Sequence, residues 1–189
     1  MKPAKTNSRG KKAHLLIAIV LLTMKAFGQG GPGRPQRRVV VSIPDRQLAV
    51  IEHGEILRIF DVAVGASVSP SPIGEFHITN RVTRPTYYHA GQIIPPGKDN
   101  PIGTRWIGLN LKGYGIHGTN VPTSIGKAAS HGCIRLRNRD MEQLFEMLRP
   151  TDVVDIRAER DEETAELFGG EPVDNRTVAQ STLAGESGQ

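Results

Sequence analysis

The chain has 189 residues, 38% of them hydrophobic and 5% aromatic, which suits one domain of ordinary size with tails and excludes a large core. Its formal net charge of +5 and isoelectric point of about 9.6 would fit a nucleic-acid-binding protein. However, six of the 24 Lys and Arg residues lie in residues 1–28, which contain no Asp or Glu. The rest of the chain contains 18 basic and 19 acidic residues and so is nearly neutral, and we expect no nucleic-acid partner.

Residues 1–28 have the pattern of a secretory signal peptide. Basic residues come first, and the apolar run 15–22 follows, too short to span a bilayer comfortably. Small residues near Ala26 and Gly28 predict cleavage after Gly28. We therefore expect export to the periplasm without stable membrane insertion. An uncleaved anchor is the alternative, because Lys25 lies just before the cleavage site.

The first half of the remaining chain reads as strands and turns. Residues 29–38, made of Gly, Pro, Gln and Arg, are expected to form a flexible linker. Short runs rich in β-branched residues follow at 39–43, 47–52, 56–65 and 74–82, separated by turn-forming sequences. This spacing predicts an antiparallel, mostly β domain. Residues 83–103 are irregular, and two interpretations stay open: a loop that flanks a cleft, or an ordinary surface loop.

The second half adds a helix. Residues 122–129 are expected to turn the chain, and residues 133–136 and 153–157 to form strands. Between these strands an apolar stripe recurs at helical spacing: Met141, Leu144, Phe145 and Leu148. We expect Asn138 or Asp140 to cap this helix. Residues 158–189 carry eight acidic and two basic residues, which predicts a disordered acidic tail after a domain over 39–157.

The single cysteine, Cys133, is the most informative residue of the chain. One cysteine cannot form an internal disulfide, and a leftover thiol in an exported protein invites oxidation. Its neighbours Ser130, His131, Gly132 and Arg135 are not those of a buried packing residue. We therefore expect a reactive thiol; packing as a small hydrophobe is the alternative.

A nucleophilic thiol needs a base and donors for the oxyanion that it creates. His117 is the candidate base, and the N–H groups of His131, Gly132 and Cys133 are the candidate donors, with Gly132 permitting close approach of a carbonyl. A zinc site of His117, His131 and Cys133, with His89 as a candidate fourth ligand, is a second hypothesis. The His-x-Cys spacing suits chelation poorly, so we expect no metal.

Residues 130–136 (SHGCIRL), preceded by His117-Gly118-Thr119, resemble the L,D-transpeptidase catalytic domain, the YkuD type. Residues 65–76 look like that family's Pro-Thr-Pro-x-Gly-x-Phe segment, with Ser71 where Thr is usual. Residues 100–106 look like its Asn-Pro-x-Gly stretch and include Trp106. Four segments in the right order, over residues 39–157, make the resemblance specific.

The resemblance implies a β-sandwich of two mixed sheets with a short helix packed on one face. It also implies an enzyme that needs no cofactor and acts on peptidoglycan stem peptides. Cys133 would attack the third residue of a tetrapeptide stem, release D-alanine and form a thioester. An amine acceptor would then resolve the thioester, giving a 3–3 cross-link or protein attachment.

The resemblance also implies roles for individual residues. His117 would be the general base, and the backbone carbonyl of Gly118 would orient its ring. Ser130, His131 and Gly132 would belong to the oxyanion and substrate-binding loop, and Arg135 would bind a substrate carboxylate or fix that loop.

Two other functions stay open at this point. Water as the acceptor would give an L,D-carboxypeptidase or amidase, and nothing in the sequence decides between water and an amine. A wall-binding module that has lost its chemistry is the other possibility, although the intact His117 and Cys133 pair argues against it.

Overall fold

The computed structural model describes residues 35–170. The expected signal peptide, most of the expected linker and residues 171–189 lie outside this range. Within residues 35–170, no helix combines the length and the apolarity that crossing a bilayer requires.

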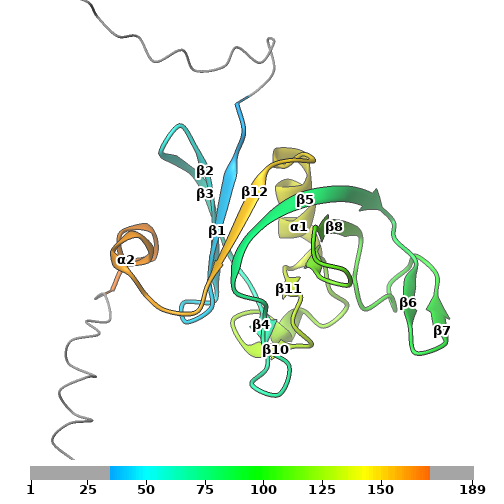
Figure 1. Cartoon of the computed structure of the whole chain (residues 1–189). Helices are drawn as coiled ribbons and strands as arrows, with labels where there is room; N and C mark the ends of the chain where they lie inside the picture. Colours follow the sequence, from blue (N-terminus) through cyan, green and yellow to red (C-terminus); the bar gives the residue numbers. More distant parts are fainter. Residues whose placement is uncertain (1–34, 171–189) are drawn as a thin grey trace, which may run out of the picture. The chain divides into compact units, whose positions relative to one another are not determined.

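The described residues form a mostly β domain around an eight-stranded mixed sheet, ordered β11-β9-β8-β5-β12-β1-β2-β3 (Figure 1). Its strands are β1 (Arg38–Ser42), β2 (Gln47–Glu52), β3 (Glu55–Asp61), β5 (Gly74–Thr83), β8 (Arg105–Leu109), β9 (Gly115–His117), β11 (Ile134–Arg135) and β12 (Val153–Arg157). Two small ladders pair β4 (Val64–Gly65) with β10 (Ala128–Ser130), and β6 (Tyr87–His89) with β7 (Gln92–Ile94). The helical segments are η1 (Pro122–Ser124), α1 (Asn138–Met147) and α2 (Glu162–Phe168).

The long strand β5 joins the two halves of the sheet and arcs across the domain in Figure 1. Its first residues, up to His77, pair with β12, and from Ile78 onward it pairs with β8, with an irregularity between Ile78 and Asn80. The expected mostly β fold with a helix on one face is confirmed. The two walls of the expected sandwich come from this one curled sheet. The purely antiparallel arrangement expected from strand spacing is wrong, because β1 pairs in parallel with β12, and β9 with β11, between segments that do not follow one another in the chain.

The core lies inside the curl of the sheet. Strand alternation turns Val39 and Val41 of β1 inward, together with Leu48 and Val50 of β2. Helix α1 closes the core with the stripe expected from the sequence, and all four of its residues are buried: Met141, Leu144, Phe145 and Leu148. Burial of this stripe holds α1 in place, because a helix this short gains little from its own backbone hydrogen bonds.

The start of α1 differs from the sequence expectation. The N-cap residue is Arg137, and no side chain caps the helix. Asn138 instead turns its side-chain oxygen toward the N–H groups of Thr104 and Thr119. The cap prediction is wrong for Asn138, because this long-range contact takes the oxygen that a local cap would use, and for Asp140, because it lies within the first turn of the helix.

The end of the expected linker is part of the domain. The N–H of Arg37 donates to the carboxylate of Asp152, and its guanidinium binds Glu52 at 2.7 Å and the carbonyl of Met147 at 2.6 Å. Arg38 already belongs to β1. The flexible-linker prediction is therefore wrong for Arg37 and Arg38, because both form specific contacts with later parts of the chain.

The expected disordered tail also begins with ordered structure. Asp161 and Thr164 form a capping box at the start of α2. At the other end of the helix, Leu167 and Phe168 pack on a small second cluster: Val40, Ala49 and Ile51, which face away from the main core on β1 and β2. The disorder prediction is wrong for this segment. Covering these outward apolar side chains with a helix removes them from water, which lowers the free energy of the folded state.

Ion pairs also connect α2 and the residue Arg160 before it to the rest of the domain. Glu163 pairs with Arg38 and, at 2.7 Å, with Arg157, while Arg160 pairs with Asp45. The Glu163–Arg38 pair is about a third exposed and contributes little stability, so the apolar contacts carry most of the attachment of α2 itself.

We predict that Phe168→Ala lowers the free energy of unfolding by roughly 1–2 kcal/mol, less than the about 3–5 kcal/mol typical of a fully buried phenylalanine. Urea unfolding followed by tryptophan fluorescence measures this change. The matched control is Glu166→Ala, which removes an exposed side chain from the same helix. Equal stability of the two variants would show that packing of Phe168 on the outer face of β1 and β2 does not stabilise the domain.

Candidate active site

The parallel pairing of β9 with β11 sets the predicted base beside Arg135, at the end of the loop that carries the predicted nucleophile. Ile116 pairs with Ile134 and His117 with Arg135, and both isoleucines point into the core. Side chains alternate along a strand, so His117 and Arg135 point to the opposite face. Cys133 immediately precedes β11, and the positive charge of Arg135 acts on both the thiol of Cys133 and the imidazole of His117. Arg135 therefore lies near both expected reactive residues.

His117 is held by its own loop. It is 4% exposed, and its Nδ1 lies 2.5 Å from the carbonyl oxygen of Gly118. A carbonyl only accepts hydrogen bonds, so Nδ1 carries the proton and Nε2 is left as the basic nitrogen. Burial lowers the pKa of His117 to about 4; the Gly118 hydrogen bond opposes this shift, and the charge of Arg135 adds to it. The ring is therefore neutral at pH 7.

Cys133 is half-buried, and its thiol donates a hydrogen bond to the carbonyl of Gly113 at 3.6 Å. Burial raises the pKa of this thiol above its ordinary value of 9.0, while a hydrogen bond from the Gly115 backbone and the charge of Arg135 lower it. The resting site therefore holds a protonated sulfur beside a neutral imidazole.

Ser130 clamps the loop that carries the cysteine. Its hydroxyl donates to the carbonyl of Cys133 at 2.6 Å and accepts the N–H of Gly132 at 3.0 Å. The Gly132 N–H is thus already used and is not free for an oxyanion, contrary to the sequence expectation. Among the described residues, the N–H groups of His131 and Cys133 have no such partner. The Ser-x-Gly spacing is a local signal for this clamp that the sequence interpretation missed.

Gly132 is required at its position by its surroundings. Its φ is +107°, and a Cβ there would lie 2.7 Å from the ring of Tyr114 and 3.1 Å from the carbonyl oxygen of Pro70. The neighbouring turn is closed by Ser71, whose hydroxyl accepts the N–H of Gly65 at 2.9 Å. The Pro-Ser-Pro segment therefore lies against the cysteine loop, and serine in place of threonine retains the hydroxyl that closes the turn.

Arg135 lies directly beside His117 in the sheet. One guanidinium nitrogen donates to the carbonyl of Ala129 at 3.4 Å, and its buried Nε has no hydrogen-bond partner among the described residues. Its positive charge favours the thiolate of Cys133 and disfavours the imidazolium of His117. This arrangement fits a residue that fixes the loop and adds positive charge next to the sulfur.

Trp106 supplies a wall of the site. It is paired with His117 across β8 and β9, and the two rings stack with centroids 5.6 Å apart and planes 19° apart. The indole also covers Gly115, where a Cβ would lie 2.7 Å from the ring. Sequence reasoning found Trp106 only through the family resemblance, and its contact with the base required knowledge of strand register.

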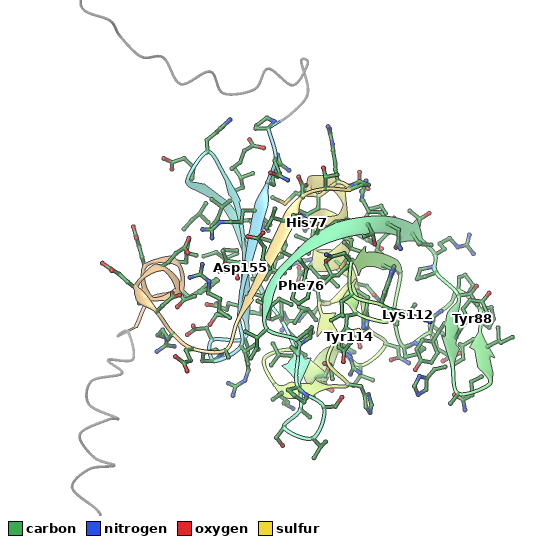
Figure 2. All side chains as sticks on the ribbon, viewed as in Figure 1. Phe76, His77, Tyr88, Lys112, Tyr114 and Asp155 are labelled. Atoms are coloured by element: carbon green, nitrogen blue, oxygen red, sulfur yellow. The ribbon has the colours of Figure 1, made fainter. Side chains whose placement is uncertain are left out.

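The irregular segment 83–103 contains a hairpin. Ala90 and Gly91, with φ of +46° and +80°, form the tight turn between β6 and β7. Asn100 anchors its base by donating to the carbonyls of Pro85 and Ile94. Tyr88, 71% exposed, lies on this hairpin, apart from Lys112 and Tyr114 on the loop between β8 and β9 (Figure 2).

The alternative of a zinc site finds no support in the geometry. Within residues 35–170, no group of three His, Cys, Asp or Glu side chains is arranged to hold a metal ion. Instead, the charge of Arg135 acts on a thiol and on a histidine whose tautomer is fixed, a combination that suits a nucleophile and its base.

Comparison with known proteins also points to the L,D-transpeptidases. The family model of the L,D-transpeptidase catalytic domain, YkuD, matches residues 36–156. The L,D-transpeptidase homologue YqjB of Bacillus subtilis is 40% identical over 122 residues, covering 62% of this chain and 68% of that protein. YkuD of the same organism is 38% identical over 106 residues, covering 56% of this chain and 57% of that protein.

Solved structures agree at the level of the fold. An L,D-transpeptidase from Mycobacterium smegmatis superposes with a TM-score of 0.56 at 19% identity, over 65% of this chain and 59% of that chain. An Enterococcus faecium L,D-transpeptidase gives 0.56 at 21% identity, over 66% and 50%. The family model covers well over half of the sequence, so the family resemblance inferred from the sequence motifs is confirmed. The chain belongs to the L,D-transpeptidase family, and residues 36–156 form its catalytic domain.

Proposed function

We propose that this protein is an exported peptidoglycan L,D-transpeptidase that uses Cys133 as its nucleophile. The observation that supports the proposal is the geometry of His117, which lies beside Arg135 in the sheet and has Nδ1 bound to the Gly118 carbonyl. This leaves Nε2 as the basic nitrogen that a general base must offer to a thiol.

The proposed reaction has two acyl transfers. The sulfur of Cys133 attacks the carbonyl carbon of the third stem residue while its proton passes to Nε2 of His117. The bond to the terminal D-alanine breaks, and His117 returns the proton to the leaving amine, which gives a thioester. An acceptor amine then attacks the thioester carbonyl and loses a proton to His117. The bond between carbon and sulfur breaks, and His117 passes the proton to the sulfur, which restores the thiol.

Charge develops on the carbonyl oxygen in both steps. The N–H groups of His131 and Cys133 are the proposed donors, because that of Gly132 is bound to Ser130. Arg135 adds a positive charge that favours the thiolate as it forms.

Alkylation of Cys133 by iodoacetamide tests the resting protonation state. The thiol pKa lies above 9.0 and that of His117 at about 4, so both groups are neutral at pH 7. Because only the thiolate reacts, the rate constant should rise about tenfold per pH unit below the thiol pKa, in wild type and in His117→Gln alike. A rate that stays constant across neutral pH and is lost in His117→Gln would indicate a thiolate–imidazolium pair instead.

Mass spectrometry of the purified protein with a tetrapeptide muropeptide tests the reaction. Wild type should release D-alanine, Cys133→Ala should give no product, and His117→Gln should lower kcat by about 10²–10⁴-fold, the usual contribution of a general base. His77→Gln, an exposed histidine on β5, is the matched control and should retain full activity. Turnover by Cys133→Ala would exclude the mechanism. A dimer as product identifies an amine acceptor, and a tripeptide identifies water.

Export is proposed from residues 1–28, whose basic start, apolar run and small residues suit a signal peptidase. Protein recovered from the periplasmic fraction of a producing host should begin at Gln29, as read by N-terminal sequencing. Recovery only from the membrane fraction with the N-terminal segment intact would instead support an uncleaved anchor.

A further inference from the structure

The side chain of Asn138 lies behind the catalytic histidine and binds two backbone groups. Its Oδ1 accepts the N–H of Thr104 and the N–H of Thr119, each at 3.2 Å. The second bond matters for the site, because the N–H of Thr119 and the carbonyl of Gly118 belong to the same peptide group.

A trans peptide group is planar, and its N–H and C=O point in opposite directions. Asn138 accepts the Thr119 N–H on one side of this group. On the other side, the Gly118 carbonyl accepts the proton of His117 Nδ1 at 2.5 Å. Fixing one end of the peptide therefore fixes the direction of the other end, and the imidazole is held through it.

The fit around Asn138 leaves this peptide little freedom. A Cβ on Gly118 would lie 2.1 Å from Oδ1 of Asn138, and a Cβ on Gly103 would lie at the same distance. The side-chain amide of Asn138 therefore fits between the backbones of Gly103 and Gly118, and any residue with a Cβ at either position would collide with it. This contact also explains why Asn138 does not cap α1.

We propose that Asn138 is a positioning residue for His117: it orients the Gly118–Thr119 peptide so that His117 stays in the Nδ1-protonated tautomer with Nε2 free. The inference rests on the proposed cysteine chemistry for its catalytic consequence. The alternative tautomer would place the proton on Nε2 and remove the base, so losing Asn138 should lower kcat and leave KM nearly unchanged.

The tautomer itself is the first readout, measured by ¹H–¹⁵N correlation spectra of the histidine rings, with His117→Gln to assign the signal. Wild type should show His117 protonated at Nδ1. Asn138→Ala should show a mixture of tautomers and a kcat lower by about 10²-fold, the loss typical of a displaced catalytic group. Asn138→Asp keeps the acceptor oxygen and should retain the wild-type tautomer.

The matched control is Asn120→Ala. The Asn120 side chain donates to the carbonyl of Asp99 at 3.0 Å and ties together the same two loops without contacting the Gly118–Thr119 peptide. It should change neither the tautomer nor kcat. Equal losses in Asn120→Ala and Asn138→Ala would overturn the proposal, because the effect would then be loosening of the loops.

The proposal remains testable even when Asn138→Ala does not fold. An Nε2-protonated His117 in wild type, or a changed tautomer in Asn138→Asp, would each overturn the proposal without Asn138→Ala. The spectra need no substrate. A protein that leaves stem peptides intact but shows the expected tautomers would therefore refute the proposed function and retain the role of Asn138.

Discussion

The site depends on the parallel register of two very short strands, β9 and β11. Pairing His117 with Arg135 turns the buried isoleucines of both strands inward and leaves His117 and Arg135 on the opposite face, with Cys133 directly before β11. A shift by one residue would send the base into the core, because side chains alternate along a strand. The bridge between Ala63 and Arg135 and the hydrogen bond from Leu136 to His117 hold this register from both sides.

The same burial that fixes His117 also keeps it neutral. Desolvation lowers the pKa of the imidazole and raises that of the thiol, so the resting pair is uncharged. In the proposed reaction, charge would separate only during the chemical steps. The charge of Arg135 lowers both pKa values, so it favours the thiolate of Cys133 and disfavours the imidazolium of His117.

Much of the fold and the identity of the candidate reactive pair could be predicted from the sequence. Alternating apolar residues marked most strands and the stripe of α1, since these signals are local. The role of Asn138 could not be predicted, because an asparagine at a helix start has the local pattern of a cap. Its contacts with the Thr104 and Thr119 backbones exist only after folding.

The segment containing α2 shows another limit of local signals. Its acidic composition resembles disorder, and only Leu167 and Phe168 offer apolar surface. The clue lay elsewhere in the chain. Val39, Val40 and Val41 are apolar in succession, so the strand they form has apolar side chains on both faces, and the second face needs a cover.

The position of β12 has a consequence for how the domain assembles. This late strand lies between β1 and β5, and it pairs Val39, near the start of the domain, with Val154, near its end. Until residues 153–157 arrive, β1, β2 and β3 have no sheet connection to β5, β8, β9 and β11. Folding to completion must therefore wait for the C-terminal part of the domain, at the cost of closing a long loop. In an exported chain, this order would keep the polypeptide open during passage across the membrane and let the sheet close on the far side.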